Sequence, residues 1–375
     1  MAPKLRKVSI TGYKSIREAE IELQDINILI GANGAGKSNL VSAFGFLHDV
    51  IAGRLGEHVA RRGGANALLH FGRKVSPQMT FKLDFELNEY EAELSPTAKD
   101  ALFFGREACW LHKPEYAQPY VEELGRGHLE SELPSQPGIA SHVLESLRSW
   151  RVFHFHDTSE SAPVKQKHAL DDNRTLRADA KNLAAYLYRL REAGAATTGS
   201  AAATAPNDLA GYRQIVGAVR LVAPFFDDFV LEPDRLNPAM IQLAWREKGS
   251  DEYFTAHPLS DGTLRFICLA TLLLQPPSHL PKAVLIDEPE LGLHPFAVHQ
   301  LAALIRAASL QTQVIVSTQS VTLVNQFGPE HLIVVDREDG GSVFRRVPPE
   351  EVEKWVDDYA VGELWEKNLL GGRPR

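Results

Sequence analysis

The chain has 375 residues, enough for one to three domains, and its 44% hydrophobic and 23% charged residues are typical of a soluble globular protein. Its formal net charge of −8 gives no general attraction to nucleic acid, so only a local basic patch could serve that role. The two cysteines, Cys109 and Cys268, are isolated, which argues against a disulfide framework or a structural zinc site and favours a reducing compartment. The sequence has neither a secretory signal nor an apolar run long enough to span a bilayer, so we expect a cytoplasmic protein without a membrane partner.

The first thirty residues have the patterns of β-strands. Residues 5–13 and 19–24 alternate between apolar and polar side chains, and the apolar run at 26–30 is typical of a strand buried on both faces. A glycine-rich loop follows. Apolar side chains then recur at helical spacing from 39 to 51, which predicts an amphipathic helix.

The middle of the chain changes character twice. Short alternating segments between 79 and 124 predict antiparallel hairpins, and residues 150–157 predict one more strand. Helical patterns dominate from 158 to 250, where a low-complexity stretch at 193–208 predicts a flexible Ala/Gly-rich loop. We therefore expect residues 158–250 to form a helical lobe inserted into a discontinuous domain made of residues 1–157 and 251–375.

Strand and helix patterns alternate again after residue 255. Helices are predicted at 264–274 and 295–308, and buried strands at 283–287 and 313–318. Two further strands and a helical tail follow. Such alternation predicts an α/β fold whose central sheet is mostly parallel and covered by helices, beside the antiparallel β part.

The segment GANGAGKS fits the pattern G-x-x-x-x-G-K-[S/T], and it lies between a predicted buried strand and a predicted helix. Its glycines let successive backbone N–H groups point at phosphate oxygens, and the helix N-terminus adds partial positive charge. Lys37 can reach the β- and γ-phosphates, and the Ser38 hydroxyl can coordinate Mg²⁺. The predicted nucleotide-binding residues are Gly31, Ala32, Asn33, Gly34, Ala35, Gly36, Lys37, Ser38 and Asn39.

Two adjacent carboxylates end the buried strand at 283–287. Asp287 would hold Mg²⁺, directly or through water, and Glu288 would polarise the water that attacks the nucleotide. Gln319 follows the next buried strand, where its amide could sense the γ-phosphate and the attacking water. Because a nucleotide kinase or a simple GTPase needs no base at Glu288, this pair favours a hydrolase.

The stretch LSDGTLRF at 259–266 has two interpretations. Ser260 or Asp261 could simply cap the apolar helix that follows. Alternatively, Ser260 and Gly262 form a second anion site at that helix N-terminus. One chain has one phosphate loop, which already surrounds its phosphates from one side. A second anion site therefore predicts a head-to-tail homodimer in which each copy closes the other's nucleotide site.

The chain resembles the ABC-type ATPases in the order of its motifs. These are the phosphate loop, the signature stretch with Ser260 and Gly262, the strand that ends in Asp287 and Glu288, and the polar switch residue Gln319. The opening VSITGYKSIREAEIELQDINILIGANGAGKSNLVSAF resembles RecF/SMC-like ATPases, and DEPELGLHP is similar to the stand-alone AAA-type relatives and the ATPase part of OLD-family proteins. The resemblance covers about 1–75 and 255–340. It implies a P-loop NTPase head of ABC/SMC type that binds ATP and Mg²⁺ and hydrolyses ATP, with Glu288 as base, Gln319 at the switch and Ser260 and Gly262 on the partner's γ-phosphate.

Two positions depart from the family pattern. Asp261 stands where the signature often has glycine, and its carboxylate adds negative charge to the anion site. Gln319 stands where many relatives have histidine, so the resemblance does not fix the rate of ATP hydrolysis. The metal-contacting glutamine of the family has no clear counterpart. The candidates are His156, Asp157 and Gln166, and His294 is a further candidate near a dimer partner.

The resemblance implies work on DNA, and the segment 54–74 carries five basic residues that could contact its backbone: Arg54, Arg61, Arg62, Arg73 and Lys74. A solvated face or a segment that contacts ATP explains these charges equally well. Only a short tail follows Asp336, so we expect no nuclease domain of the OLD type. Any nuclease or toxin that this ATPase controls would be a separate effector chain.

We therefore predict an ATP-driven dimer in DNA repair or maintenance, or in anti-phage defence. Two alternatives stay open. One is the ATP-binding subunit of a transporter, although the LSGGQ signature and a clear glutamine loop are both missing. The other is a scaffold that binds ATP and hydrolyses it slowly.

Overall fold

The structure is a computed structural model that describes residues 4–113, 115, 118–192, 207–352, 355 and 359–372. The predicted flexible loop at 193–208 thus lies, up to residue 206, outside the described residues. The chain divides into two compact units, which we describe separately. Unit 1 comprises Met1–Val152, Pro281–Asp287 and Gln313–Arg375, and unit 2 comprises Phe153–Leu280 and Glu288–Thr312.

Unit 1 contains a six-stranded, mostly parallel sheet in the order β17-β16-β3-β15-β14-β8. The pairs β16–β3, β3–β15 and β15–β14 are parallel, and β17 joins β16 as an antiparallel hairpin. The strands are β3 (Ile26–Ile30), β8 (Trp150–Phe153), β14 (Ala283–Asp287), β15 (Gln313–Ser317), β16 (Leu332–Glu338) and β17 (Gly341–Arg346). The predicted buried strands β3, β14 and β15 are therefore confirmed.

A second, antiparallel sheet in unit 1 has the order β2-β1-β4-β5-β6-β7. Its last four strands include the hairpins predicted between 79 and 124, and β1 pairs with both β2 and β4. Its strands are β1 (Lys7–Tyr13), β2 (Ile16–Glu22), β4 (Met79–Phe85), β5 (Asn88–Pro96), β6 (Leu102–Leu111) and β7 (Tyr120–Gly125).

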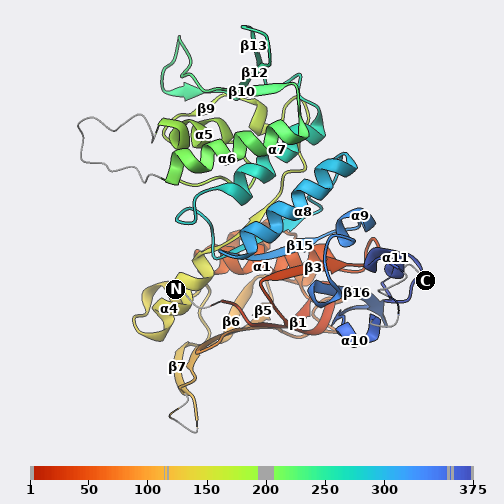
Figure 1. Ribbon diagram of the computed structural model, residues 1–375. Helices are drawn as coiled ribbons and strands as arrows, with labels where there is room; N and C mark the ends of the chain where they lie inside the picture. The colour runs from red at the N-terminus through yellow and green to blue at the C-terminus, as the bar shows by residue number, and fades with distance from the viewer. Residues whose placement is uncertain are drawn as a thin grey trace. The chain divides into compact units, whose positions relative to one another are not determined.

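Helix α1 (Lys37–Ile51) joins the two sheets of unit 1 (Figure 1). One hydrophobic core contains its apolar side chains together with those of the antiparallel sheet and of β14, β15 and β16. Burial of that helix face is the main force that fixes its position. The other helices of the unit are α2 (Leu55–Arg61), α3 (Ala65–Leu68), α4 (Ile139–Arg148), α9 (Val321–Val324), α10 (Pro349–Val352) and α11 (Val361–Glu366).

Unit 2 contains four packed helices and short strands. Helix α6 packs against α5, α7 and α8, and α7 also packs against α8. Strands β10, β12 and β13 form an antiparallel sheet whose Trp245 ring lies 5.3 Å from the Phe254 ring and 5.5 Å from the Phe225 ring. The elements are β9 (His168–Ala169), α5 (Leu183–Glu192), α6 (Asn207–Val222), β10 (Phe226–Val230), β11 (Met240–Ile241), β12 (Ala244–Glu247), β13 (Tyr253–Thr255), α7 (Asp261–Leu274) and α8 (Pro295–Ser309).

Two details differ from the sequence-based expectations. The segment 158–250 contains the predicted helices α5 and α6, but also the strands β9 to β12, so its structure is not purely helical. The strand predicted at 150–157 ends at Phe153. Beyond it, the carbonyls of Phe155 and His156 accept hydrogen bonds from the Arg265 side chain instead of from a neighbouring strand.

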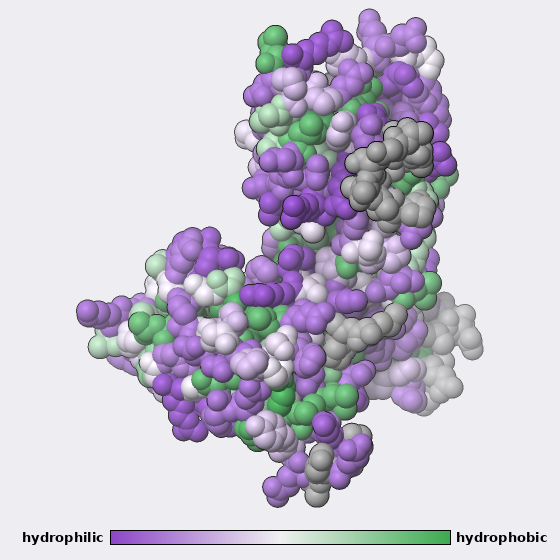
Figure 2. Space-filling view, turned by 90° about the vertical axis from the view of Figure 1, so that its left-hand side faces the viewer, coloured by the Kyte–Doolittle hydropathy of each residue, from purple (hydrophilic) through white to green (hydrophobic). Residues whose placement is uncertain are grey.

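None of the helices within the described ranges is long and apolar enough to cross a membrane. Hydrophilic residues cover most of the face in Figure 2, with small hydrophobic patches among them.

Candidate nucleotide-binding site

The phosphate loop lies in unit 1 between β3 and α1, as the sequence predicts. Gly36 precedes α1 with φ +119°, and a Cβ there would lie 2.0 Å from Ser342 Oγ. Only glycine fits this position, because both the backbone conformation and the close neighbour exclude a side chain. The glycine that the motif places before Lys37 thus meets a physical constraint of this fold.

The first turn of α1 has the features of an anion site. No side chain caps it, and it contains no acidic residue. The buried Lys37 ammonium donates hydrogen bonds to the carbonyl oxygens of Gly31 (2.6 Å) and Ala32 (3.0 Å), while Ser38 is exposed. Uncapped N–H groups, the helix dipole and a lysine at the loop together favour a phosphate group.

A serine from the far end of the chain holds the loop. Ser342 Oγ on β17 lies 2.5 Å from the Ala35 carbonyl oxygen and 2.7 Å from Ser15 Oγ. Asn39 Nδ2 donates to Ser15 Oγ at 2.7 Å, so the contacts connect the loop, α1 and the β1–β2 turn. Sequence reasoning missed Ser15 and Ser342, because no local pattern links them to the loop. We call these three side chains and the Ala35 carbonyl the loop anchor.

Two oxygen atoms with no hydrogen-bond partner among the described residues lie at the carboxyl ends of neighbouring strands. Asp287 on β14 is directly opposite Ser317 on β15 in the parallel register. Both Asp287 Oδ1 and Ser317 Oγ are buried and make no hydrogen bond to any described residue, which is unusual for polar atoms. Helix α1, which begins with Lys37 and Ser38, packs against both strands.

This donor set fits Mg²⁺. The ion prefers oxygen ligands and is usually bound by one or two carboxylates, waters and substrate phosphates rather than by a complete protein cage. Accordingly, no cluster of three or more His, Cys, Asp or Glu side chains suited to a metal occurs in the described part of the chain. Asp287 and Ser38 are the residues that would hold Mg²⁺, which would neutralise phosphate charge during transfer.

Gln319 follows β15 and lines a cavity of about 260 Å³ together with Gly31, Ala32 and Asn33 of the phosphate loop. The structure therefore brings the predicted switch residue to the phosphate loop. Glu288 follows Asp287 with φ +43°, a conformation that non-glycine residues rarely adopt, and such strain is often found at functional sites. Its role as the base stays a prediction.

In unit 2, Ser260 is the N-cap of α7, and its Oγ accepts a hydrogen bond from Thr263 N (3.2 Å). The capping interpretation of LSDGTLRF is thus confirmed. A Cβ on Gly262 would lie 2.3 Å from Gly292 O, so this turn packs tightly on the loop before α8. A cap and an anion site are compatible, and the action of Ser260 and Gly262 on a partner's ATP stays a prediction.

The remaining candidates make contacts within unit 2. The His156 carbonyl accepts from Arg265, and Asp157 Oδ1 accepts from the backbone and hydroxyl of Ser159, which hold the pKa of Asp157 below its usual range. Gln166 Nε2 donates to Glu160 O at 3.1 Å. These contacts give no direct support for a metal-contacting role of any of the three residues.

His294 is the N-cap of α8, and its Nδ1 accepts from Phe296 N at 3.3 Å. Sequence reasoning missed Arg265, whose buried guanidinium donates to Phe155 O at 2.9 Å. The sequence did contain a sign of this contact, because an arginine within a mostly apolar, buried helix needs hydrogen-bond acceptors.

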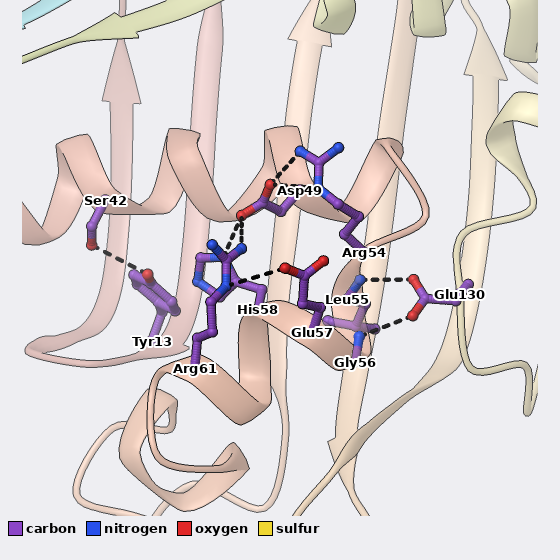
Figure 3. A network of polar contacts seen from close by, with 10 residues as sticks. All are labelled: Tyr13, Ser42, Asp49, Arg54, Leu55, Gly56, Glu57, His58, Arg61 and Glu130. Atoms are coloured by element: carbon purple, nitrogen blue, oxygen red, sulfur yellow. Dashed lines mark hydrogen bonds and ion pairs between the residues drawn. The ribbon is translucent and has the colours of Figure 1, made fainter. Parts of the chain in front are cut away.

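The basic segment at 54–74 is largely neutralised within unit 1 (Figure 3). Asp49 pairs with Arg54 (2.5 Å), His58 (2.7 Å) and Arg61 (3.5 Å). Outside this view, Arg73 lies 3.6 Å from an Asp100 oxygen. Burial acts to raise the pKa of Asp49, but hydrogen bonds from His58 and Arg54 hold it below its usual value. These pairs stabilise the α1–α2 corner and leave less free charge for DNA than the sequence suggests.

Comparison with known sequences identifies a family and two similar proteins. Residues 26–325 match the family described as "AAA domain, putative AbiEii toxin, Type IV TA system". Two proteins named DNA replication and repair protein RecF are each 33% identical to the chain. The match to the protein of Renibacterium salmoninarum spans 91 residues, or 24% of this chain and 23% of that protein. The match to the protein of Acidothermus cellulolyticus spans 86 residues, or 22% and 23%. The chain thus matches about a quarter of the length of these relatives.

Solved structures of SMC heads share the fold. An Smc head bound to the C-terminal winged-helix domain of ScpA superposes with a TM-score of 0.57 at 17% identity, covering 94% of this chain and all of that one. The Smc head with an extended coiled coil from Pyrococcus furiosus gives 0.58 at 15% identity, covering 95% and 99%. The predicted fold class, a P-loop NTPase of SMC-head type, is confirmed.

Proposed function

The chain belongs to this AAA domain family and is RecF/SMC-like, and we propose that it binds Mg–ATP at the phosphate loop and hydrolyses it. The observation that carries the proposal is the set of groups that meet at the carboxyl ends of the parallel strands in unit 1. There, neighbouring elements contribute the uncapped start of α1, the Lys37 ammonium, and oxygens of Asp287 and Ser317 that make no hydrogen bond within the described ranges. This combination supports cation-assisted binding of a triphosphate.

In the proposed reaction, Lys37 and the loop N–H groups bind the phosphates, and Asp287 and Ser38 would hold the metal ion. Glu288 accepts a proton from the attacking water, and Gln319 orients that water. The water oxygen forms a bond to the γ-phosphorus, the bond to the β–γ bridging oxygen breaks, and ADP and inorganic phosphate leave.

The test compares wild type with Glu288→Gln in Mg–ATP binding and turnover. The variant should keep ATP binding and lose turnover by about 10²-fold or more, because it removes the proton acceptor. Glu330→Gln makes the same chemical change at a surface position and should behave as wild type. Wild-type turnover that Glu288→Gln leaves intact would refute the role of Glu288, and a wild type that binds no ATP would refute the whole proposal.

We further propose that the active form is a head-to-tail dimer in which Ser260 and Gly262 of each copy contact the terminal phosphate bound by the other. Supporting this, Ser260 lies at the N-terminus of a 14-residue helix, and that end of a helix attracts anions. Ser260→Arg should abolish ATP-dependent dimerisation and turnover while each copy still binds ATP.

The biological role that we propose is DNA repair or maintenance, or anti-phage defence together with a separate effector protein. The relation to proteins named for DNA replication and repair supports the first role, and the family description, which names a toxin–antitoxin system, supports the second. The DNA role is tested by the ATPase rate with and without duplex DNA over a salt series.

Arg62→Ala combined with Lys74→Ala should lower retention on DNA, because the other basic residues of segment 54–74 are engaged in ion pairs. The control exchanges Lys113, which lies after β6, and Arg126, which lies after β7, for alanine. No DNA stimulation and no retention at low salt would refute the DNA role.

A further inference from the structure

A segment outside the matched family region lies on the nucleotide-binding edge of unit 1. Residues 359–372 include α11, which packs against α9, the short helix after Gln319 (Figure 1). Gly362 N donates to Asn325 Oδ1 at 2.7 Å, and the Leu364 and Leu370 side chains are buried. We call residues 359–372 the docked segment.

The end of the docked segment reaches the phosphate loop itself. Gly372 N donates to Asp336 Oδ2 at 2.8 Å, and the Leu370 carbonyl accepts from Arg345 at 2.9 Å. A Cβ on Gly372 would lie 3.4 Å from Gly31 Cα. The backbone of the docked segment therefore lies against the first glycine of the loop.

Trp365 of the docked segment lines the 260 Å³ cavity with residues 31–33, Gln319, Glu366 and Gly372. Only 8% of the Trp365 residue is exposed. Its Nε1 is buried with no hydrogen-bond partner among the described residues, although an indole N–H acts only as a donor. Buried donors in native proteins nearly always have an acceptor, so we expect an acceptor for this N–H that the described residues do not supply.

The walls of the cavity indicate which acceptor that is. It is bounded by the loops that follow β3 and β15, and parallel strands present such loops at one edge of the sheet. The loop after β3 binds phosphates and Gln319 follows β15, so the terminal phosphate of ATP is the oxygen-rich group nearest to both. Glu366 is exposed on the rim, where solvent weakens its repulsion of an anion.

We propose that Trp365 is a nucleotide-binding residue that senses the terminal phosphate: its Nε1–H donates to a γ-phosphate oxygen and helps to distinguish ATP from ADP. The docked segment is then one wall of the nucleotide site. This inference rests on the proposed ATP binding. It adds a residue that lies beyond the 26–325 region of the family match.

The test is Trp365→Phe in the full chain, which removes the N–H and keeps an aromatic ring. Affinity for Mg–ATP should fall roughly tenfold or more, while affinity for Mg–ADP should change by less than about twofold, because ADP has no γ-phosphate. The control is Trp110→Phe on β6, whose ring packs under the Arg106 guanidinium and does not line the cavity. Equal losses for the two nucleotides, or no loss for either, would overturn the inference.

A second measurement follows the wild type itself and uses the variant only to assign one signal. The indole N–H signal of Trp365 in the ¹⁵N-labelled wild type, assigned by its absence in Trp365→Phe, should shift with a non-hydrolysable ATP analogue and not with ADP. A signal that does not move at saturating analogue would overturn the inference while the proposed ATPase stands. A wild type that binds neither nucleotide would overturn both.

Discussion

Replacing Ser342 by alanine tests whether the loop anchor prepares the phosphate loop for its ligand. The change removes one oxygen atom, which lies 2.5 Å from the Ala35 carbonyl and 2.7 Å from Ser15 Oγ. It adds no atom, so no clash with Gly36 arises. The Ala35 carbonyl loses its side-chain donor in a region where the serine itself is 1% exposed.

The expected cost follows from the burial of these groups. A buried acceptor that loses its partner costs about 1–3 kcal/mol. If the loop loosens locally, ATP must reorder it on binding, and affinity should fall by about 5- to 150-fold. Isothermal titration with Mg–ATP measures the loss, and hydrogen exchange of residues 31–38 should show faster exchange in the free variant.

The matched control is Val343→Ala, the next residue on β17, whose side chain is 39% exposed and faces away from the loop anchor. It should bind ATP as wild type does. Ser342→Ala with unchanged affinity and unchanged exchange of residues 31–38 would refute the idea that the loop anchor prepares the loop.

Three further predictions concern other parts of the molecule. Asp287→Asn should raise the Mg²⁺ concentration needed for half-maximal ATPase activity by about tenfold or more, measured by a Mg²⁺ titration after chelation with EDTA; an unchanged midpoint would contradict its role as a ligand. Arg265→Met should lower the free energy of unfolding of unit 2 by about 3 kcal/mol in urea denaturation, because two backbone carbonyls lose a charged donor; a loss below about 1 kcal/mol would contradict this. Burial lowers the pKa of His58, although its hydrogen bond to Asp49 acts in the opposite direction. The His58 imidazole is therefore protonated at a higher pH in the unfolded chain than in the folded chain. The associated stability is complete above the unfolded pKa of about 6.5 and falls as the pH drops below it, and His58→Gln should flatten this fall in denaturation curves between pH 7.5 and 5.

The local motifs were the part of the site that the sequence could predict. The phosphate loop and Asp287 depend on residues a few positions apart and on the strands before them, and β3 and β14 occur as predicted. Ser260 was predicted as a possible cap for the same reason, since a cap needs only the helix that follows it.

Contacts between distant parts of the chain could not be predicted in this way. Ser342 is 307 residues from Ala35, and only the sheet order β17-β16-β3 brings it to the loop. Trp365 likewise reaches the cavity because α11 packs on α9, which no periodicity indicates. The strand predicted at 150–157 was too long because Arg265, more than a hundred residues away, takes up the carbonyls that a strand partner would bind.

The most direct test of the proposed ATP-driven dimer is the specific ATPase rate of the full chain over a protein concentration series at saturating Mg–ATP. If Ser260 and Gly262 of one copy complete the other copy's site, the rate per chain rises with concentration and levels off where dimers predominate. A measurable rate per chain that stays constant across the series, in a range where light scattering finds only monomers, would contradict the proposal.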